Sequence, residues 1–114
     1  MVDPNLSDME KVIVAILQNN GKMNLRTLAS RIGSLKEHFE NNPADVPSGM
    51  ESLASCVDDV PRSLRKLQDR NLVIREGSNP KEWKYVITDE GKKKEVIPAD
   101  SARTMMDTLG KIAD

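Results

Sequence analysis

The stretch DDVPRSLRKLQDRNLVIREGSNPKEWKYVITDEGKKK, residues 58–94, decides the fold of this chain. It predicts a helix over 60–70, because apolar residues recur at helical spacing after an aspartate pair that is able to cap it. A strand over 72–75, a Gly-Ser-Asn-Pro tip and a return strand over 83–87 follow, since apolar and polar residues alternate in the return strand. Thr88-Asp89-Glu90-Gly91 then opens a short final turn of helix. The segment is therefore a helix, a two-stranded arm and a helical turn.

The residues before this segment predict further helices. Ser7 and Glu10 form a capping box for a helix over 8–19. A very short strand at Met23 and a helix over 25–33 follow, with Asn24 as the cap and Gly33 as the stop. A second capping box predicts a separate short helix over 34–40, and MESLASCV predicts another over 50–57.

The C-terminal residues predict one more helix. Pro98 breaks the chain, Ser101 caps the helix, and an apolar stripe follows at Met105, Met106, Leu109 and Ile112. Such a stripe either folds back onto its own domain or pairs with a second copy. We therefore divide the chain into residues 1–97 and a C-terminal helix, 98–114, as a possible dimerisation element. The predicted fold class is mainly α with a small antiparallel β arm, α+β.

Composition and charge limit the class of protein. The 114 residues suffice for one domain, with 38% hydrophobic residues and three aromatic ones. The net charge is −1, but residues 58–94 carry ten basic and seven acidic residues, +3, and both flanking parts are negative. The single cysteine, Cys56, has no disulfide partner, and no secretory signal or membrane-spanning stretch is present, which favours a cytoplasmic protein without membrane contact.

Three motifs resemble the winged helix-turn-helix domains of prokaryotic transcriptional regulators: LRTLASRIG, VPRSLRKLQDRNLVI and WKYVITDEGKKK. The last is similar to the strand-to-helix junction of MarR- and PadR-type regulators, where Thr and Gly flank two polar residues. The resemblance covers about three quarters of the chain, residues 7–94, and implies a helix that enters the major groove of DNA. Asn79-Pro80 with Trp83 also resembles the wing of Z-DNA-binding domains, although helix 60–70 lacks the tyrosine which those domains stack on nucleic acid.

The chain departs from the family pattern between 34 and 57. In the family, the helix ending in Ile-Gly is soon followed by the recognition helix, whereas here the acidic SLKEHFENN follows. Either residues 34–57 are an insertion, or MESLASCV is the helix that positions the recognition helix. Both alternatives make 60–70 the recognition helix.

The candidate DNA-binding residues lie on helix 60–70 and on the arm. Arginine pairs well with guanine edges, and arginine and lysine both suit phosphates, so a cationic stripe opposite the apolar one predicts contact with double-stranded DNA. Cations near the tip of the arm suit the flanking backbone. The predicted DNA-binding residues are Arg62, Ser63, Arg65, Lys66, Asp69, Arg75, Lys81 and Lys84.

Other chemistry finds little support in the sequence. His38 is the only histidine, and no nucleophile–base pair, glycine-rich phosphate loop or set of metal ligands is present, so we expect neither an enzyme nor a cofactor. The leading interpretation is a DNA-binding transcriptional regulator, expected to be a homodimer, with no polar cluster that marks a small-molecule effector site. The alternatives are a winged-helix protein-interaction module of a replication, transcription or RNA-processing assembly, and an architectural protein that binds DNA with little sequence preference.

Overall fold

The structure is a computed structural model and describes residues 6–47, 50 and 60–112. The described residues form a mainly α-helical fold with a small three-stranded antiparallel sheet, as the α+β class predicts. The elements in chain order are α1 (Asp8–Asn20), β1 (Lys22–Asn24), α2 (Leu25–Asn41), the 3-10 turn η1 (Pro43–Asp45), α3 (Val60–Asp69), β2 (Val73–Glu76), β3 (Lys84–Ile87), α4 (Asp89–Lys93) and α5 (Ala99–Ile112). The predicted helix over 50–57, Cys56 and the capping aspartates lie outside the described residues, apart from Met50, which is buried.

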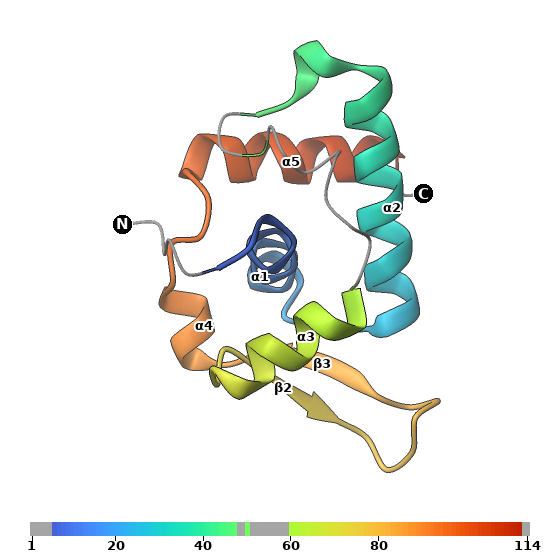
Figure 1. The fold of residues 1–114 in the computed structure, drawn as a ribbon, viewed down its shortest axis with the longest axis vertical. Helices are drawn as coiled ribbons and strands as arrows, with labels where there is room; N and C mark the ends of the chain where they lie inside the picture. Colours follow the sequence, from blue (N-terminus) through green and yellow to red (C-terminus); the bar gives the residue numbers. More distant parts are fainter. Residues whose placement is uncertain (1–5, 48–49, 51–59, 113–114) are drawn as a thin grey trace.

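Helix α1 is the centre of the core. Ser7 and Glu10 form the predicted capping box, in which the Glu10 amide donates to the Ser7 hydroxyl and the Ser7 amide to the Glu10 carboxylate. Every residue from Val12 to Leu17 is buried, which an amphipathic surface helix would not allow. Figure 1 shows why: α2, α3, α4 and α5 surround α1, which is seen end-on. None of the described helices is both long and apolar enough to cross a membrane.

Helix α2 corrects one prediction. Gly33 does not stop it, and Ser34 does not cap a new helix, because α2 continues without a break to Asn41. The buried stripe runs through the glycine as Leu28, Ile32, Leu35 and Phe39. A glycine inside a helix costs about 1 kcal/mol. Burial of a large apolar side chain stabilises by about 1.5–3 kcal/mol, so burying both Leu35 and Phe39 outweighs that cost.

The sheet has the order β1-β3-β2, so β3 lies in the middle. Asn71 adopts a positive φ of 61°, which ends α3 and turns the chain into β2. The two long strands begin and end within one residue of the predicted bounds. Tyr85 and Ile87 are buried while Lys84 is exposed, which confirms the predicted alternation in β3.

The Thr88–Gly91 junction fixes α4 to the end of α3. The Thr88 hydroxyl accepts from the Gly91 amide at 3.0 Å and donates to the Asn71 carbonyl at 2.7 Å. The Thr88 amide donates to the Leu72 carbonyl at 3.1 Å. Only glycine fits at position 91, because a Cβ there would clash with the Leu72 carbonyl and lie 2.6 Å from Ile87 Cδ1. The two polar residues between them, Asp89 and Glu90, are exposed.

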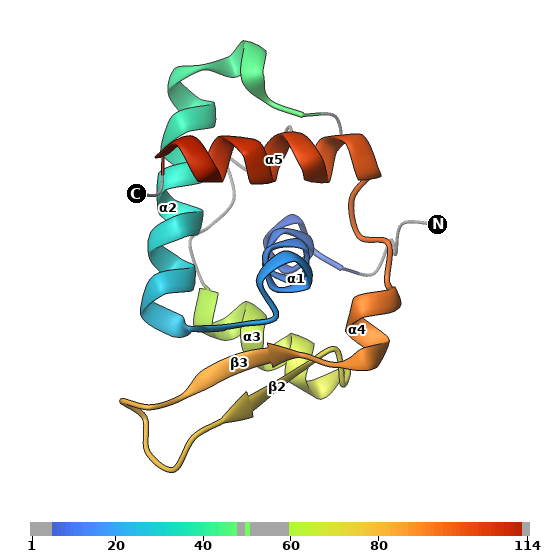
Figure 2. The ribbon, with the colours of Figure 1, turned by 180° about the vertical axis from the view of Figure 1, so that it is seen from behind.

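Helix α5 corrects a second prediction. It begins at Ala99, and Ser101 is buried within it rather than capping it, because the Pro98 carbonyl accepts the Ala102 amide at 2.9 Å. Met105 and Leu109 are buried, whereas Met106 and Ile112 are partly buried. The helix packs against α1 and α2, and Figure 2 shows it crossing in front of α2. The C-terminal half of α2, predicted as a separate helix, therefore provides the surface on which α5 packs.

Candidate nucleic-acid interface

The outer face of α3 carries the predicted cationic stripe. Val60, Leu64 and Leu67 are at most 2% exposed and fix the helix to the core. The opposite face is solvent-exposed and consists of Arg62, Arg65, Lys66 and Asp69. Neighbouring helices of the described chain thus leave these side chains accessible, and the helix presents three cations and one anion to solvent.

Ser63 does not share this exposed face. It is only 9% exposed, although the sequence placed it among the DNA-binding residues. The reason is its position one helical turn from Val60 and Leu67, which places it on the inward side of α3. Gln68 is half-buried beside the stripe.

Arg75 and Trp83 form a stacked pair on the arm made by β2 and β3. Arg75 lies opposite Tyr85 in the register, and Val73 lies opposite Ile87. Residues directly opposite each other have side chains on the same face of the sheet. Arg75 therefore lies on the same face as the buried residues Val73, Tyr85 and Ile87. The Arg75 guanidinium lies 3.6 Å from the centroid of the Trp83 ring, a cation–π contact that holds the charge in place.

Lys84 lies on the other face of the arm. It alternates with Tyr85 along β3 and pairs with Glu76 of β2, so its charge has an acidic neighbour across the strands. Lys81 lies in the loop between the strands, where its amide donates to the Asn79 side chain at 3.0 Å. The three cations predicted on the arm are therefore exposed but do not form one continuous strip.

The tip of the arm is a tight turn. Gly77 has a φ of 123°, and a Cβ there would lie 2.8 Å from the Glu82 carbonyl oxygen. The Glu82 amide donates to the Asn79 carbonyl at 2.9 Å. These contacts close the turn and give Lys81 a defined place at the end of the arm.

A groove between the start of α2 and the arm is a feature that the sequence did not predict. It encloses about 600 Å³ and is lined by Asn24, Leu25, Arg26, Pro80, Lys81, Trp83 and Tyr85. β1 pairs with β3 over Lys22–Asn24, so α2 begins directly beside the arm. No local pattern in the sequence connects Arg26 with Trp83, because only this pairing brings them together.

The described residues show neither a metal site nor a site for a small-molecule effector. His38 lies 3.3 Å from Asp45, but no three potential metal-ligating side chains of the described residues gather together. A hollow of about 580 Å³ beside α5 is lined partly by His38, Asp45, Asp107 and Lys111. The His38–Asp45 pair and the hollow both face solvent, and the residues that form them do not indicate a particular ligand.

The functional assignment has to rest on α3, the arm and the groove. No model of a known protein family matches the chain, and no curated protein or solved structure matches it either.

Proposed function

We propose that this chain is a winged-helix DNA-binding regulator that acts in the cytoplasm. The order helix, strand, helix, helix, strand, strand and the central place of β3 support this proposal. The observation that carries it is the orientation of α3. The helix buries Val60, Leu64 and Leu67 and leaves its cationic face exposed, directly before a protruding two-stranded arm.

In this mechanism α3 enters the major groove. Arg62 and Arg65 are suited to guanine edges, because the guanidinium fork pairs with O6 and N7 together, and Lys66 is suited to phosphate. The arm contacts the flanking backbone through Arg75 and Lys81. The Arg75 guanidinium stacks on Trp83 and is therefore oriented before DNA binds, so less side-chain entropy is lost on binding.

We further propose that the regulator is a homodimer, which suits palindromic operators with half-sites about 34–36 Å apart. Dimerisation would use the accessible part of the C-terminal end of α5. Ile112 is one such residue, since it is partly buried.

Fluorescence anisotropy with labelled genomic duplexes tests the proposal. Arg65→Ala and Lys66→Ala should each weaken binding by about 1–3 kcal/mol, because each removes a contact to base or phosphate. Arg103→Ala is the matched control, since Arg103 is exposed and belongs to the first half of α5, a helix that Figure 1 shows on the opposite side of α1 from the arm. Equal affinity of the wild type and the three variants would show that α3 does not contact DNA.

A protein-interaction module is the second candidate. Ile74 is 47% exposed and is the one exposed large hydrophobic side chain among the described residues. It lies opposite the half-buried Val86 on the outer face of the sheet, where a partner protein would cover both. This candidate predicts no measurable DNA affinity at physiological salt and a co-purifying protein whose binding Ile74→Lys abolishes.

A further inference from the structure

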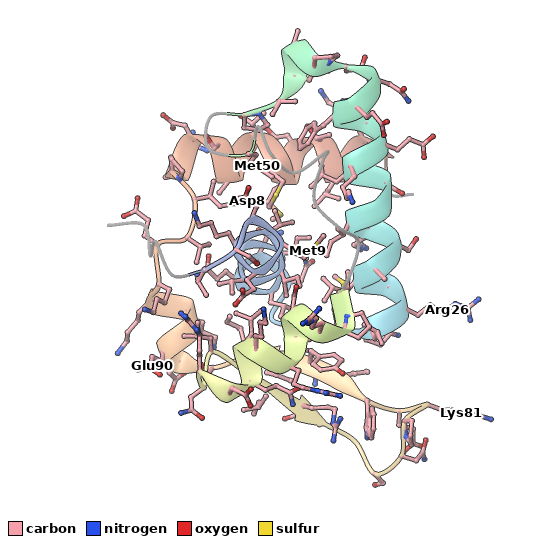
Figure 3. The ribbon with its side chains drawn as sticks, in the orientation of Figure 1. Asp8, Met9, Arg26, Met50, Lys81 and Glu90 are labelled. Atoms are coloured by element: carbon pink, nitrogen blue, oxygen red, sulfur yellow. The ribbon has the colours of Figure 1, made fainter. Side chains whose placement is uncertain are left out.

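The groove between α2 and the arm combines aromatic and cationic side chains. Trp83 and Tyr85 form its wall on the strand side, and Leu25 and Pro80 add apolar surface. Both charged side chains that line it, Arg26 and Lys81, are cations, and no acidic residue of the described chain lines it. Figure 3 shows Arg26 and Lys81 extending on the same side of the molecule, from the first turn of α2 and from the tip of the arm. The groove is complementary to a flat apolar group that carries negative charge.

An unpaired nucleotide has this chemistry. Proteins that bind single strands combine cations along the backbone with aromatic rings on which bases stack. Trp83 is half-buried and lines the groove, and the Arg75 guanidinium packs over one face of its indole. The space of about 600 Å³ falls within the range of small-ligand sites, about 300–1,000 Å³.

A peptide fits the same place less well. Extended peptides gain much of their affinity by pairing with an unpaired strand edge. Here β3 is paired on both sides over Lys84–Val86, with β1 on one edge and β2 on the other. The strand that forms the groove wall thus offers no free edge along these residues.

We propose that the groove holds one unpaired nucleotide, with its base stacked on Trp83 and its phosphate between Arg26 and Lys81. The inference rests on the proposed DNA binding and makes it more specific. The preferred substrate is then a duplex with a short single-stranded extension beside the α3 site, rather than a continuous duplex.

Trp83 is the single tryptophan of the chain, so its fluorescence reports directly on the groove. The full-length protein is titrated with a blunt duplex, with the same duplex carrying short thymidine overhangs at either end, and with overhangs of abasic sugar-phosphate. We expect thymidine overhangs to quench Trp83 and to bind roughly tenfold more tightly than blunt DNA, and abasic overhangs, which keep the phosphate but supply no base to stack, to bind with intermediate affinity and without quenching.

Arg26→Ala tests the phosphate contact without touching α3. Arg26 is exposed, so the variant should fold, which circular dichroism checks. It should lose the preference for overhangs and keep the wild-type affinity for blunt duplex, whereas Arg103→Ala should keep both. Equal binding of blunt, abasic and thymidine substrates, with duplex affinity intact, would overturn the groove proposal alone.

One further outcome separates this inference from the proposed function. If a thymidine oligonucleotide quenches Trp83 in an Arg26-dependent manner while no duplex binds, the groove proposal stands and duplex recognition by α3 is wrong. If neither kind of DNA binds, both proposals fail. Quenching by an acidic aromatic peptide but by no nucleotide would overturn the nucleotide as the occupant.

Discussion

Gly91 lies where no larger residue fits. A Cβ at this position would meet the Leu72 carbonyl oxygen and two carbon atoms of Ile87, one of them at 2.6 Å. Neither the backbone carbonyl nor the buried Ile87 is able to move aside easily. We expect Gly91→Ala to lower the free energy of unfolding by about 1–3 kcal/mol, the usual cost of overpacking. Urea denaturation followed by circular dichroism measures this change.

Gly33 provides the matched comparison, because it also lies in a helix but has nothing within 4 Å of its missing Cβ. Gly33→Ala should raise the free energy of unfolding by about 0.5–1 kcal/mol, since alanine restricts the unfolded chain and favours the helix. The same substitution thus has opposite signs at the two sites. If both variants were destabilised, α2 would not be a continuous helix through Gly33.

At the scale of elements, the helix starts set by neighbouring residues were predictable. Ser7, Asn24 and Thr88 all cap helices as expected, because each accepts from an amide three residues later. Predictions failed where distant packing decided the outcome. Gly33 does not end α2, because Leu35 and Phe39 are buried beyond it, and Ser101 is buried inside α5.

The candidate site follows the same division. Helical spacing identified the exposed face of α3, and alternation identified the buried face of β3. The spacing rule alone would have excluded Ser63, which lies three residues after Val60 and four before Leu67. The stack of Arg75 on Trp83 and the approach of Arg26 to the arm depend on strand register, which the sequence pattern does not specify.

The Gln18 side chain links helix α1 to α4 and its C-cap. The Gln18 amide nitrogen donates to the Gly91 carbonyl at 2.8 Å and to the Lys94 carbonyl at 2.7 Å. Gln18→Ala should destabilise the fold by roughly 1–2 kcal/mol, because both carbonyls at the end of α4 lose this donor. Asn19→Ala, at the exposed neighbouring position of α1, should change stability by less than about 0.5 kcal/mol. Thermal or urea unfolding of both variants checks the difference, and equal effects would contradict the role of Gln18.

At the scale of the whole molecule, α5 belongs to the core. Met105 is fully buried against the same chain, so Met105→Ala should cost about 2–5 kcal/mol through the cavity it leaves. The loss should be the same at low and high protein concentration, because the contacts are made within one chain. Urea unfolding at two concentrations, with sedimentation velocity, measures both properties. A variant that kept its stability but lost self-association would instead place Met105 between two chains.

The charge of the molecule is unevenly distributed, and this asymmetry gives the DNA proposal a quantitative test. Residues 60–94 carry ten basic and five acidic side chains, +5, while the rest of the chain carries seven and thirteen, −6, which together give the net −1. The negative remainder repels phosphates, so only the face with α3 and the arm should approach DNA. Each phosphate neutralised on a duplex changes the slope of log K against log salt concentration by about −0.9. We expect a steep negative slope for the wild type, a slope shallower by about one for Lys66→Ala, and an unchanged slope for Arg103→Ala. A slope near zero in the wild type would show that phosphates are not the partner, because a cationic surface that binds a duplex has to release counterions.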